Sequence, residues 1–211
     1  MSIWTSKTKR RGAVTLAALL FLSACVDGGG GFARAPSQMA VAGGSVIIAG
    51  PRDYCVDRRA SQPEAGFVLM GGCASVSGAA SQPQPRVPAV LMASVSGPGA
   101  GTPVAQSLGE MESFFTSEAG RAALSQSGSA ETVRVLETRS ADGVFYIHAR
   151  DQSEGLAEAV RDEYWRALFE LRGRLVSASV FGTDARPFSS DAGHATLRAF
   201  VSALRAANPE S

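Results

Sequence analysis

The first 24 residues constrain this chain most, because they carry the pattern of an export signal. A basic cluster with two lysines and two arginines occupies residues 7–11. Residues 12–22 follow without a charge and are rich in Ala and Leu. This apolar run is too short to span a bilayer, which takes about 20 residues, but it has the length of a signal-peptide core, about 7–15 residues. The pattern therefore predicts export and leaves the later residues to form the folded protein.

The leader ends in Leu22-Ser23-Ala24-Cys25. This tetrapeptide resembles the lipobox of bacterial lipoproteins, and the resemblance implies that residues 1–24 are a signal peptide and that Cys25 becomes the acylated mature N-terminus. A short buried helix ending in Cys is the alternative, but such a helix would not begin with a basic cluster. The pair Arg10-Arg11 also suggests twin-arginine export, although no strong consensus follows it, so we favour the ordinary secretory route. We expect a protein of the cell envelope, lipid-anchored to a bacterial membrane and facing the periplasm.

The composition of the mature chain excludes several classes of function. Both lysines lie in the leader, so Schiff-base and P-loop chemistry have no lysine to use. The mature chain has sixteen arginines against nineteen acidic residues, a mildly acidic balance. Nucleic-acid binders instead carry basic patches, so we expect no nucleic-acid partner.

The mature chain divides into a linker and one domain. Residues 25–44 hold the lipidated Cys25, four consecutive glycines and few large apolar residues, which predicts a flexible tether. Residues 45–211 have the length of a single domain. Residues 77–86 contain two prolines and no apolar periodicity, so we expect a surface loop there and no domain boundary.

Alternating and β-branched runs predict the strands. The turn at Asp142-Gly143 predicts a hairpin between two of them. Residues 156–171 fit a helix well, but the aromatic run from Tyr164 leads into Arg172-Gly173, which equally suggests two strands around a turn; we favour a hairpin from about Glu163. The expected strands cover residues 45–49, 67–74, 87–95, 132–138, 144–150 and 175–181.

Two helices are predicted from caps and periodicity. Ser107 and Glu110 form a capping-box pattern, followed by Leu108, Met111 and Phe115 on one face. A second helix begins near Ser190 or Asp191 and carries an apolar stripe at helical spacing, with Pro209 beyond its end. The stripe comprises Leu197, Phe200, Val201 and Leu204.

This order of elements predicts an α+β fold, an antiparallel sheet packed with helices as an α/β/α sandwich. It resembles the PsbP/Mog type of sandwich through the helix around Phe114-Phe115, the hairpin from Tyr164-Trp165 to Phe181, and the C-terminal helix. The resemblance covers most of residues 45–207 and has no diagnostic motif. It implies an accessory or assembly protein, an analogy at the level of the fold.

Cys55 and Cys73 are the cysteines that remain once Cys25 is lipidated. An even number of cysteines in an exported chain predicts a disulfide, here one that stabilises the fold by roughly 3 kcal/mol. A redox or metal pair is the alternative, but the spacing is not Cys-x-x-Cys and no His lies near in sequence.

Few residues suggest catalysis. His148 and His194 are the two histidines, and either is a possible general base, although we expect both to be ordinary surface or half-buried residues. No Gly-x-Ser-x-Gly occurs, and no metal-ligand spacing occurs, so we assign no catalytic residue, no metal and no cofactor. The glycine-rich residues 97–101 lack the third glycine of a dinucleotide loop. Arg58-Arg59 is a weak basic patch that we read as a solvated turn.

The leading hypothesis is a non-catalytic envelope lipoprotein that binds or helps assemble another protein at the membrane. One alternative is a periplasmic, hydrolase-like enzyme that uses His148 or His194 with an acid that spacing does not reveal. Another is a small-ligand carrier, which would need a deep apolar pocket.

Overall fold

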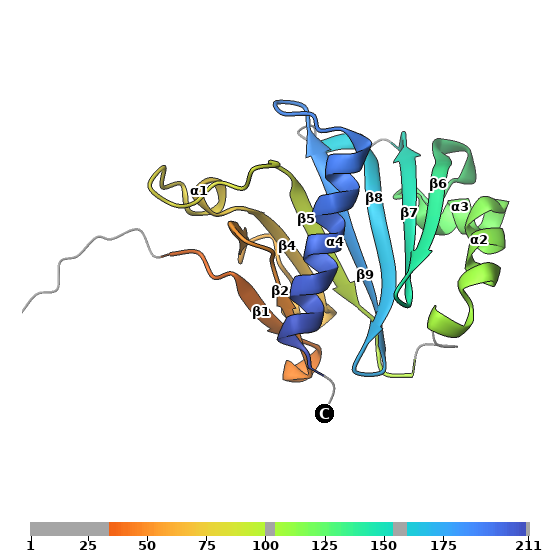
Figure 1. The fold of residues 1–211 in the computed structure, drawn as a ribbon, viewed down its shortest axis with the longest axis horizontal. Helices are drawn as coiled ribbons and strands as arrows, with labels where there is room; N and C mark the ends of the chain where they lie inside the picture. Colours follow the sequence, from red (N-terminus) through yellow and green to blue (C-terminus); the bar gives the residue numbers. More distant parts are fainter. Residues whose placement is uncertain (1–33, 100–103, 154–159, 210–211) are drawn as a thin grey trace, which may run out of the picture. The chain divides into compact units, whose positions relative to one another are not determined.

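A computed structural model describes residues 34–99, 104–153 and 160–209. Within them, a seven-stranded antiparallel sheet has the strand order β3-β4-β5-β9-β8-β7-β6, and helices pack against it (Figure 1). The predicted α+β class and α/β/α sandwich are confirmed. The predicted signal peptide and the lipidation site Cys25 lie outside the described residues.

The helices and strands follow the order that the sequence predicts, and the structure adds further short elements. The strands are β1 (Gln38–Val41), β2 (Val46–Ala49), β3 (Tyr54–Val56), β4 (Phe67–Gly72), β5 (Val90–Val95), β6 (Val133–Ala141), β7 (Val144–Asp151), β8 (Val160–Leu171) and β9 (Arg174–Thr183). The α-helices are α1 (Cys73–Ser77), α2 (Leu108–Thr116), α3 (Glu118–Leu124) and α4 (Ser190–Ala207), and short 3-10 turns lie at Ala42–Gly44, Pro63–Ala65, Val104–Gln106 and Ala130–Thr132.

The folded domain begins earlier than the predicted residue 45. Strand β1 pairs with β2 in a separate two-stranded sheet, and Val41 is buried in the main core. The prediction of a flexible tether up to residue 44 is therefore wrong for residues 38–44. Strand β1 is short and lies between Gly- and Ser-rich residues, so the local sequence does not indicate it. Its stability comes from pairing with β2 and from tertiary packing.

Two predicted strands are shorter than expected. Strand β4 ends at Gly72 because Cys73 and Ala74 begin helix α1. Strand β5 begins at Val90, three residues after the predicted start, since a proline at 88 cannot donate a ladder hydrogen bond.

The ambiguous aromatic segment forms a hairpin, as we predicted. Strands β8 and β9 pair in antiparallel register and turn through Arg172 and Gly173, both with positive φ, 50° and 69°. Two consecutive residues of positive φ give the tight turn whose twist matches that of the flanking strands.

Each face of the sheet buries its own apolar cluster. Strand β8 shows the alternation: Trp165 and Phe169 belong to the cluster beneath α4, whereas Tyr164 packs on the opposite face with residues of α2 and α3. The predicted stripe of α4 is buried in full, with Leu197, Phe200, Val201 and Leu204 at most 3% exposed. The three layers are thus α4, the sheet, and the α2–α3 pair.

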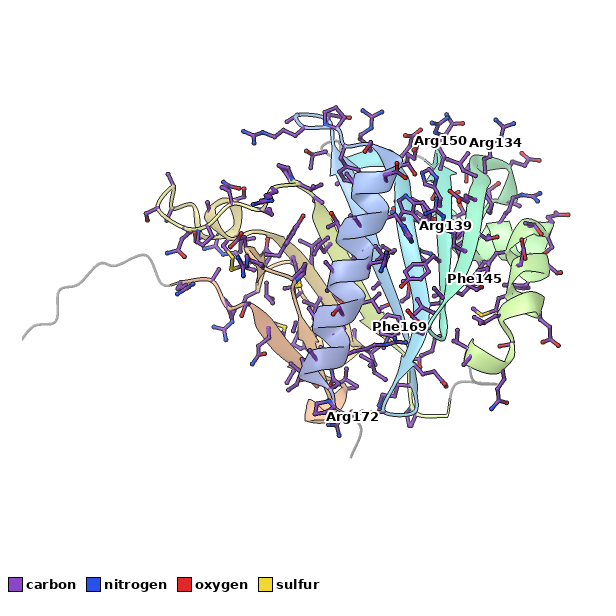
Figure 2. The ribbon with its side chains drawn as sticks, viewed as in Figure 1. Arg134, Arg139, Phe145, Arg150, Phe169 and Arg172 are labelled. Carbon is purple, nitrogen blue, oxygen red and sulfur yellow. A yellow bond between two sulfur atoms is a disulfide. The ribbon has the colours of Figure 1, made fainter. Side chains whose placement is uncertain are left out.

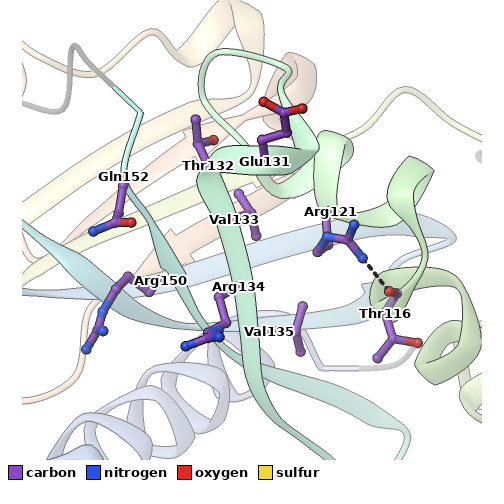
Figure 3. Close-up of a pocket in the computed structure, with 9 residues that line it drawn as sticks. All are labelled: Thr116, Arg121, Glu131, Thr132, Val133, Arg134, Val135, Arg150 and Gln152. Atoms are coloured by element: carbon purple, nitrogen blue, oxygen red, sulfur yellow. Dashed lines mark hydrogen bonds between the residues drawn. The ribbon is translucent and has the colours of Figure 1, made fainter.

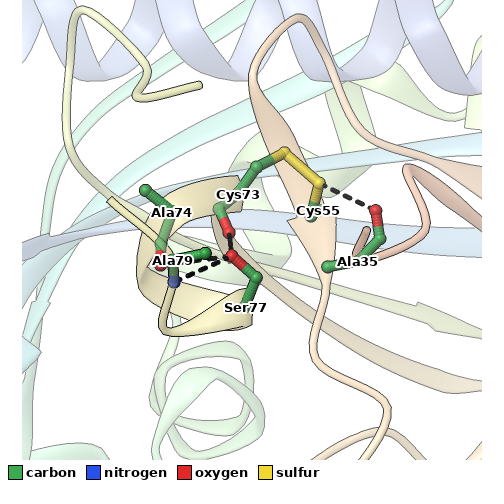
Figure 4. Close-up of a disulfide and its surroundings, with 6 residues drawn as sticks. All are labelled: Ala35, Cys55, Cys73, Ala74, Ser77 and Ala79. Atoms are coloured by element: carbon green, nitrogen blue, oxygen red, sulfur yellow. Dashed lines mark hydrogen bonds between the residues drawn. A yellow bond between two sulfur atoms is a disulfide. The ribbon is translucent and has the colours of Figure 1, made fainter. Parts of the chain in front are cut away.

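The predicted disulfide joins Cys55 on β3 to Cys73 at the start of α1, with 4.7 Å between their Cα atoms (Figure 4). Both cysteines are buried, and Cys55 Sγ lies 3.2 Å from the carbonyl oxygen of Ala35. The bridge therefore ties together the edge strand, the short helix and the segment that enters the domain. None of the described helices is long and apolar enough to cross a membrane.

Candidate functional site

His148 lies at the centre of a polar and aromatic cluster on the sheet. Strands β7 and β8 pair His148 opposite Trp165 and Arg150 opposite Glu163. The His148 ring stacks on the Trp165 ring, with centroids 4.6 Å apart and planes 3° from parallel. Tyr146, two residues earlier on β7, belongs to the cluster beneath α4 on the same face of the sheet. His148 is 7% exposed, so the prediction of an ordinary surface or half-buried residue is wrong for this histidine.

A chain of hydrogen bonds runs from helix α4 through His148 to the adjacent strand. Trp165 Nε1 donates to Ser190 Oγ at 3.2 Å, and Ser190 Oγ lies 3.4 Å from His148 Nδ1. His148 Nε2 lies 2.9 Å from Glu163 Oε1. A carboxylate can only accept, so Nε2 donates to Glu163; in the neutral ring Nδ1 is then the acceptor, and the Ser190 hydroxyl is its donor.

Glu163 remains a carboxylate in this environment. Burial alone would raise the pKa of Glu163, but hydrogen bonds from Arg150 and His148 outweigh burial and lower the pKa. The bond from Arg150 Nη2 to Glu163 Oε2 is 2.6 Å long. A negative charge is therefore held against the outer nitrogen of His148.

His194 joins the same cluster from the first turns of α4. Its ring lies 4.6 Å from Trp165 and 5.2 Å from Tyr146, centroid to centroid. Arg139 Nη1 lies 3.0 Å from His194 Nδ1. Burial, and then the positive charge of Arg139, lower the pKa of His194. His194 is thus a neutral ring that accepts from an arginine, an environment that disfavours a general base.

The order Ser190, His148, Glu163 is that of a nucleophile, a base and an orienting acid. The pocket beside it measures only about 100 Å³, whereas ligand pockets usually measure about 300–1,000 Å³. Its lining includes Phe188 and Gly182, and it lies beside Ser190 at the start of α4. We call it the His148 pocket. This series of hydrogen bonds can relay a proton between Ser190 and Glu163 through His148. The same bonds attach the N-terminus of α4 to the sheet.

A second and larger hollow lies at the edge of the sheet. It measures about 620 Å³ and follows the start of β6, the last strand of the sheet, between β7 and the α2–α3 pair (Figure 3). We call it the β6 groove. Polar and charged side chains dominate its lining, which comprises Thr116, Arg121, Glu131, Thr132, Val133, Arg134, Val135, Arg150 and Gln152.

Hydrogen bonds fix the two ends of the β6 groove. Arg121 Nη1 donates to the carbonyl oxygen of Thr116 at 2.7 Å, which closes the turn between α2 and α3 (Figure 3). At the other end, the buried carboxylate of Asp151 accepts from the backbone and hydroxyl of Ser153 and from the backbone of Gln126. Burial raises the pKa of Asp151, but these hydrogen bonds outweigh it and lower the pKa. These bonds thus hold the α2–α3 turn and the segment that follows β7, both of which contribute residues to the groove.

The structure also locates the remaining residues that the sequence singled out. Arg58 and Arg59 lie in an exposed turn in which Asp57 Oδ1 accepts from the backbone of Arg59 at 2.9 Å, as the solvated-turn interpretation predicts. Of the glycine-rich loop, residues 97–99 are described and residues 100–101 are not. Within the described ranges, no group of three His, Cys, Asp or Glu side chains could hold a metal ion.

The sequence did not reveal the partners of the histidines. Glu163 and Ser190 are 15 and 42 residues from His148, and only the register of β7 with β8 and the start of α4 bring them together. No sequence motif marks the β6 groove, because its lining residues come from separate segments in and next to α2, α3, β6 and β7. The alternating residues around Arg134 predicted a strand. They did not predict that this strand lies at the edge of the sheet.

No protein-family model matches the sequence of this chain, and no curated protein matches it either. Among solved structures, the chain is similar to cyanobacterial PsbP (CyanoP) from Synechocystis sp. PCC 6803, with 15% identity over 86% of this chain and 96% of that one and a TM-score of 0.38. It is also similar to the Ran-binding protein Mog1p of Saccharomyces cerevisiae, with 10% identity over 82% of this chain and 94% of that one and a TM-score of 0.43. The PsbP/Mog resemblance in element order thus recurs in three dimensions, at a level of similarity that supports no inference about partners.

Proposed function

We propose that this chain is a lipid-anchored envelope protein whose folded domain binds another protein at the membrane surface. In this proposal Cys25 carries the lipid, the segment after it gives reach, and the domain provides the binding surface. The observation that supports binding most directly is the β6 groove, an open hollow of about 620 Å³ over the edge of the sheet. Sheet edges and hollows of mixed polarity are common places for protein recognition.

The arrangement of Ser190, His148 and Glu163 favours a second candidate, a hydrolase that uses Ser190 as nucleophile. Two features count against it. The bond from Ser190 Oγ to His148 Nδ1 is long, at 3.4 Å, and His148 is 7% exposed. The adjacent pocket of about 100 Å³ leaves little room for a substrate beside the serine. The carrier alternative has less support, since the β6 groove is open and lined by charged and polar residues.

Genetic complementation tests the binding proposal against the hydrolase. A strain that lacks the gene and shows an envelope phenotype receives the wild-type chain or the double variant His148→Asn, His194→Asn. We expect the double variant to restore at least half of the wild-type function wherever it accumulates normally. Asn retains a polar side chain but cannot act as a general base near neutral pH.

The matched control is Ser190→Ala, which removes the nucleophile and leaves both histidines. Failure of both variants at normal abundance, with labelling of the wild-type Ser190 by a fluorophosphonate probe, would make the hydrolase the better account.

A further inference from the structure

The start of β6 presents backbone groups that lack a strand partner. Gln152 N donates to the carbonyl oxygen of Thr132 at 2.9 Å, which directs the backbone groups of Thr132 toward β7. Because these directions alternate along a strand, Val133 and Val135 direct their own groups outward. The N–H of Val133 donates to Ala130. Apart from the ladder with β7, no backbone hydrogen bond among the described residues uses the Val133 carbonyl or either backbone group of Val135.

The free stretch coincides with the groove. A bulge between Val135 and Glu137 interrupts the ladder with β7, and bulges of this kind commonly end the part of an edge that can accept another strand. Thr132, Val133, Arg134 and Val135 all line the β6 groove. An extended segment laid in the groove would therefore reach the outward carbonyl and N–H groups.

Two arginines stand directly opposite each other beside this edge. Arg134 on β6 pairs in register with Arg150 on β7, and Figure 2 shows both near the same end of the sheet. Like charges directly opposite on an antiparallel pair destabilise it. Arg150 already forms ion pairs with two carboxylates, Glu163 at 2.6 Å and Asp162 at 3.6 Å. No described acidic side chain forms an ion pair with Arg134. A carboxylate placed beside Arg134 would relieve the repulsion between the two arginines.

An exposed apolar side chain lies beside the same region. Phe114 on α2 is 46% exposed and Leu136 on β6 is 39% exposed, and they are the large hydrophobic residues exposed in the described part of the chain. Leu136 directly follows Val135, which lines the groove. A partner strand here would gain apolar contact with Leu136 beside a polar centre, a composition common in protein interfaces.

We propose that the β6 groove binds an extended acidic segment of a partner protein, which adds a strand to β6 and places a carboxylate beside Arg134. This inference rests on the proposed binding function and specifies the chemistry of the partner. Strand addition supplies affinity through backbone bonds, and the Arg134 guanidinium supplies the preference for acidic side chains. A lipid headgroup offers the negative charge but not the alternating N–H and C=O groups that this edge requires.

Binding of synthetic peptides to the detergent-solubilised mature chain tests this inference. The probe is a short fluorescent peptide of alternating Glu and Val, compared with a Lys and Val peptide and with a Glu and Val peptide N-methylated at alternate residues. We expect the Glu and Val peptide to bind and the other two to bind roughly tenfold more weakly or worse, because one lacks the charge and the other lacks the backbone donors.

Arg134→Glu should weaken binding of the Glu and Val peptide roughly tenfold and reverse the preference toward Lys and Val. The matched control is Arg58→Glu, the same charge reversal at an exposed arginine in the β3–β4 connection, which should leave the affinity unchanged.

Equal binding of the N-methylated peptide would overturn strand addition, because charge attraction alone would then suffice. A dimer in light scattering that Arg134→Glu dissolves would overturn the assignment of a separate partner. If no peptide binds while the envelope partner still cross-links elsewhere on the domain, this inference fails and the proposed function does not.

Discussion

Removing the Cys55–Cys73 disulfide is expected to lower the free energy of unfolding by about 3 kcal/mol. The expected change in melting temperature is a decrease of about 6–12 °C for a domain of this size. The reason is that the bridge closes a loop between residues 18 apart and restricts the unfolded chain. The measurement is denaturant unfolding of the double variant Cys55→Ala, Cys73→Ala beside the oxidised wild type.

The wild type in reductant serves as the control for this prediction. Reductant should destabilise the wild type by a similar amount and leave the double variant unaffected, since the variant has no bridge to lose. Both cysteines are buried, at 2% and 6% exposure, so Ala leaves small apolar gaps that add to the loss. A wild type whose unfolding midpoint is the same with and without reductant would show that the bridge contributes nothing.

Replacing the lipidation site is expected to move the protein out of the membrane fraction. Cys25→Ala removes the sulfur that would carry the lipid, and a chain without acyl groups has no comparable attachment, since stable anchoring usually takes two lipid signals. We expect nearly all of the wild-type protein in the pelleted envelope and most of the Cys25→Ala protein in the soluble fraction or as uncleaved precursor. Labelling with an alkyne-bearing palmitate should report the modification directly.

The double variant Cys55→Ala, Cys73→Ala is the matched control for lipidation. It also removes cysteines, but it should keep both the palmitate label and the membrane location because Cys25 remains. Mass spectrometry of the mature N-terminal peptide completes the test. An unmodified N-terminus that begins after Cys25 would contradict the lipoprotein assignment.

The sequence predicted those parts of the fold that local chemistry determines. Interactions between residues near in sequence determine the apolar stripe of α4 and the tight turn at Arg172-Gly173. The oxidising environment expected for an exported chain accounts for the pairing of the two cysteines. Strand β1 and helix α3 were missed, because their stability comes from partners that are distant in sequence or from packing. Gly120 illustrates this for α3: a Cβ there would lie 2.0 Å from the Phe114 carbonyl oxygen, a close approach that no local pattern announces.

The candidate sites were harder to predict than the fold for a physical reason. The register between β7 and β8 decides that Glu163 meets Arg150 and His148, and a shift by one residue would send these side chains to opposite faces. The sequence between those strands does not determine that register. The place of β6 at the edge likewise depends on β5 pairing with β9, a contact between residues 81 to 91 positions apart in the sequence.

Photo-cross-linking in living cells tests the central claim, that the anchored domain binds a protein partner. A benzophenone amino acid replaces Leu136 beside the β6 groove, Arg58 in the β3–β4 connection, or Arg198 on α4, one position at a time in the full-length chain. We expect irradiation to give a discrete adduct with another envelope protein from position 136, weaker or absent adducts from positions 58 and 198, and loss of the adduct in the Cys25→Ala background. An adduct from position 58 or 198 alone would keep the binding function and relocate its surface. No adduct from any of the three positions, with all variants folded and at the membrane, would contradict the account.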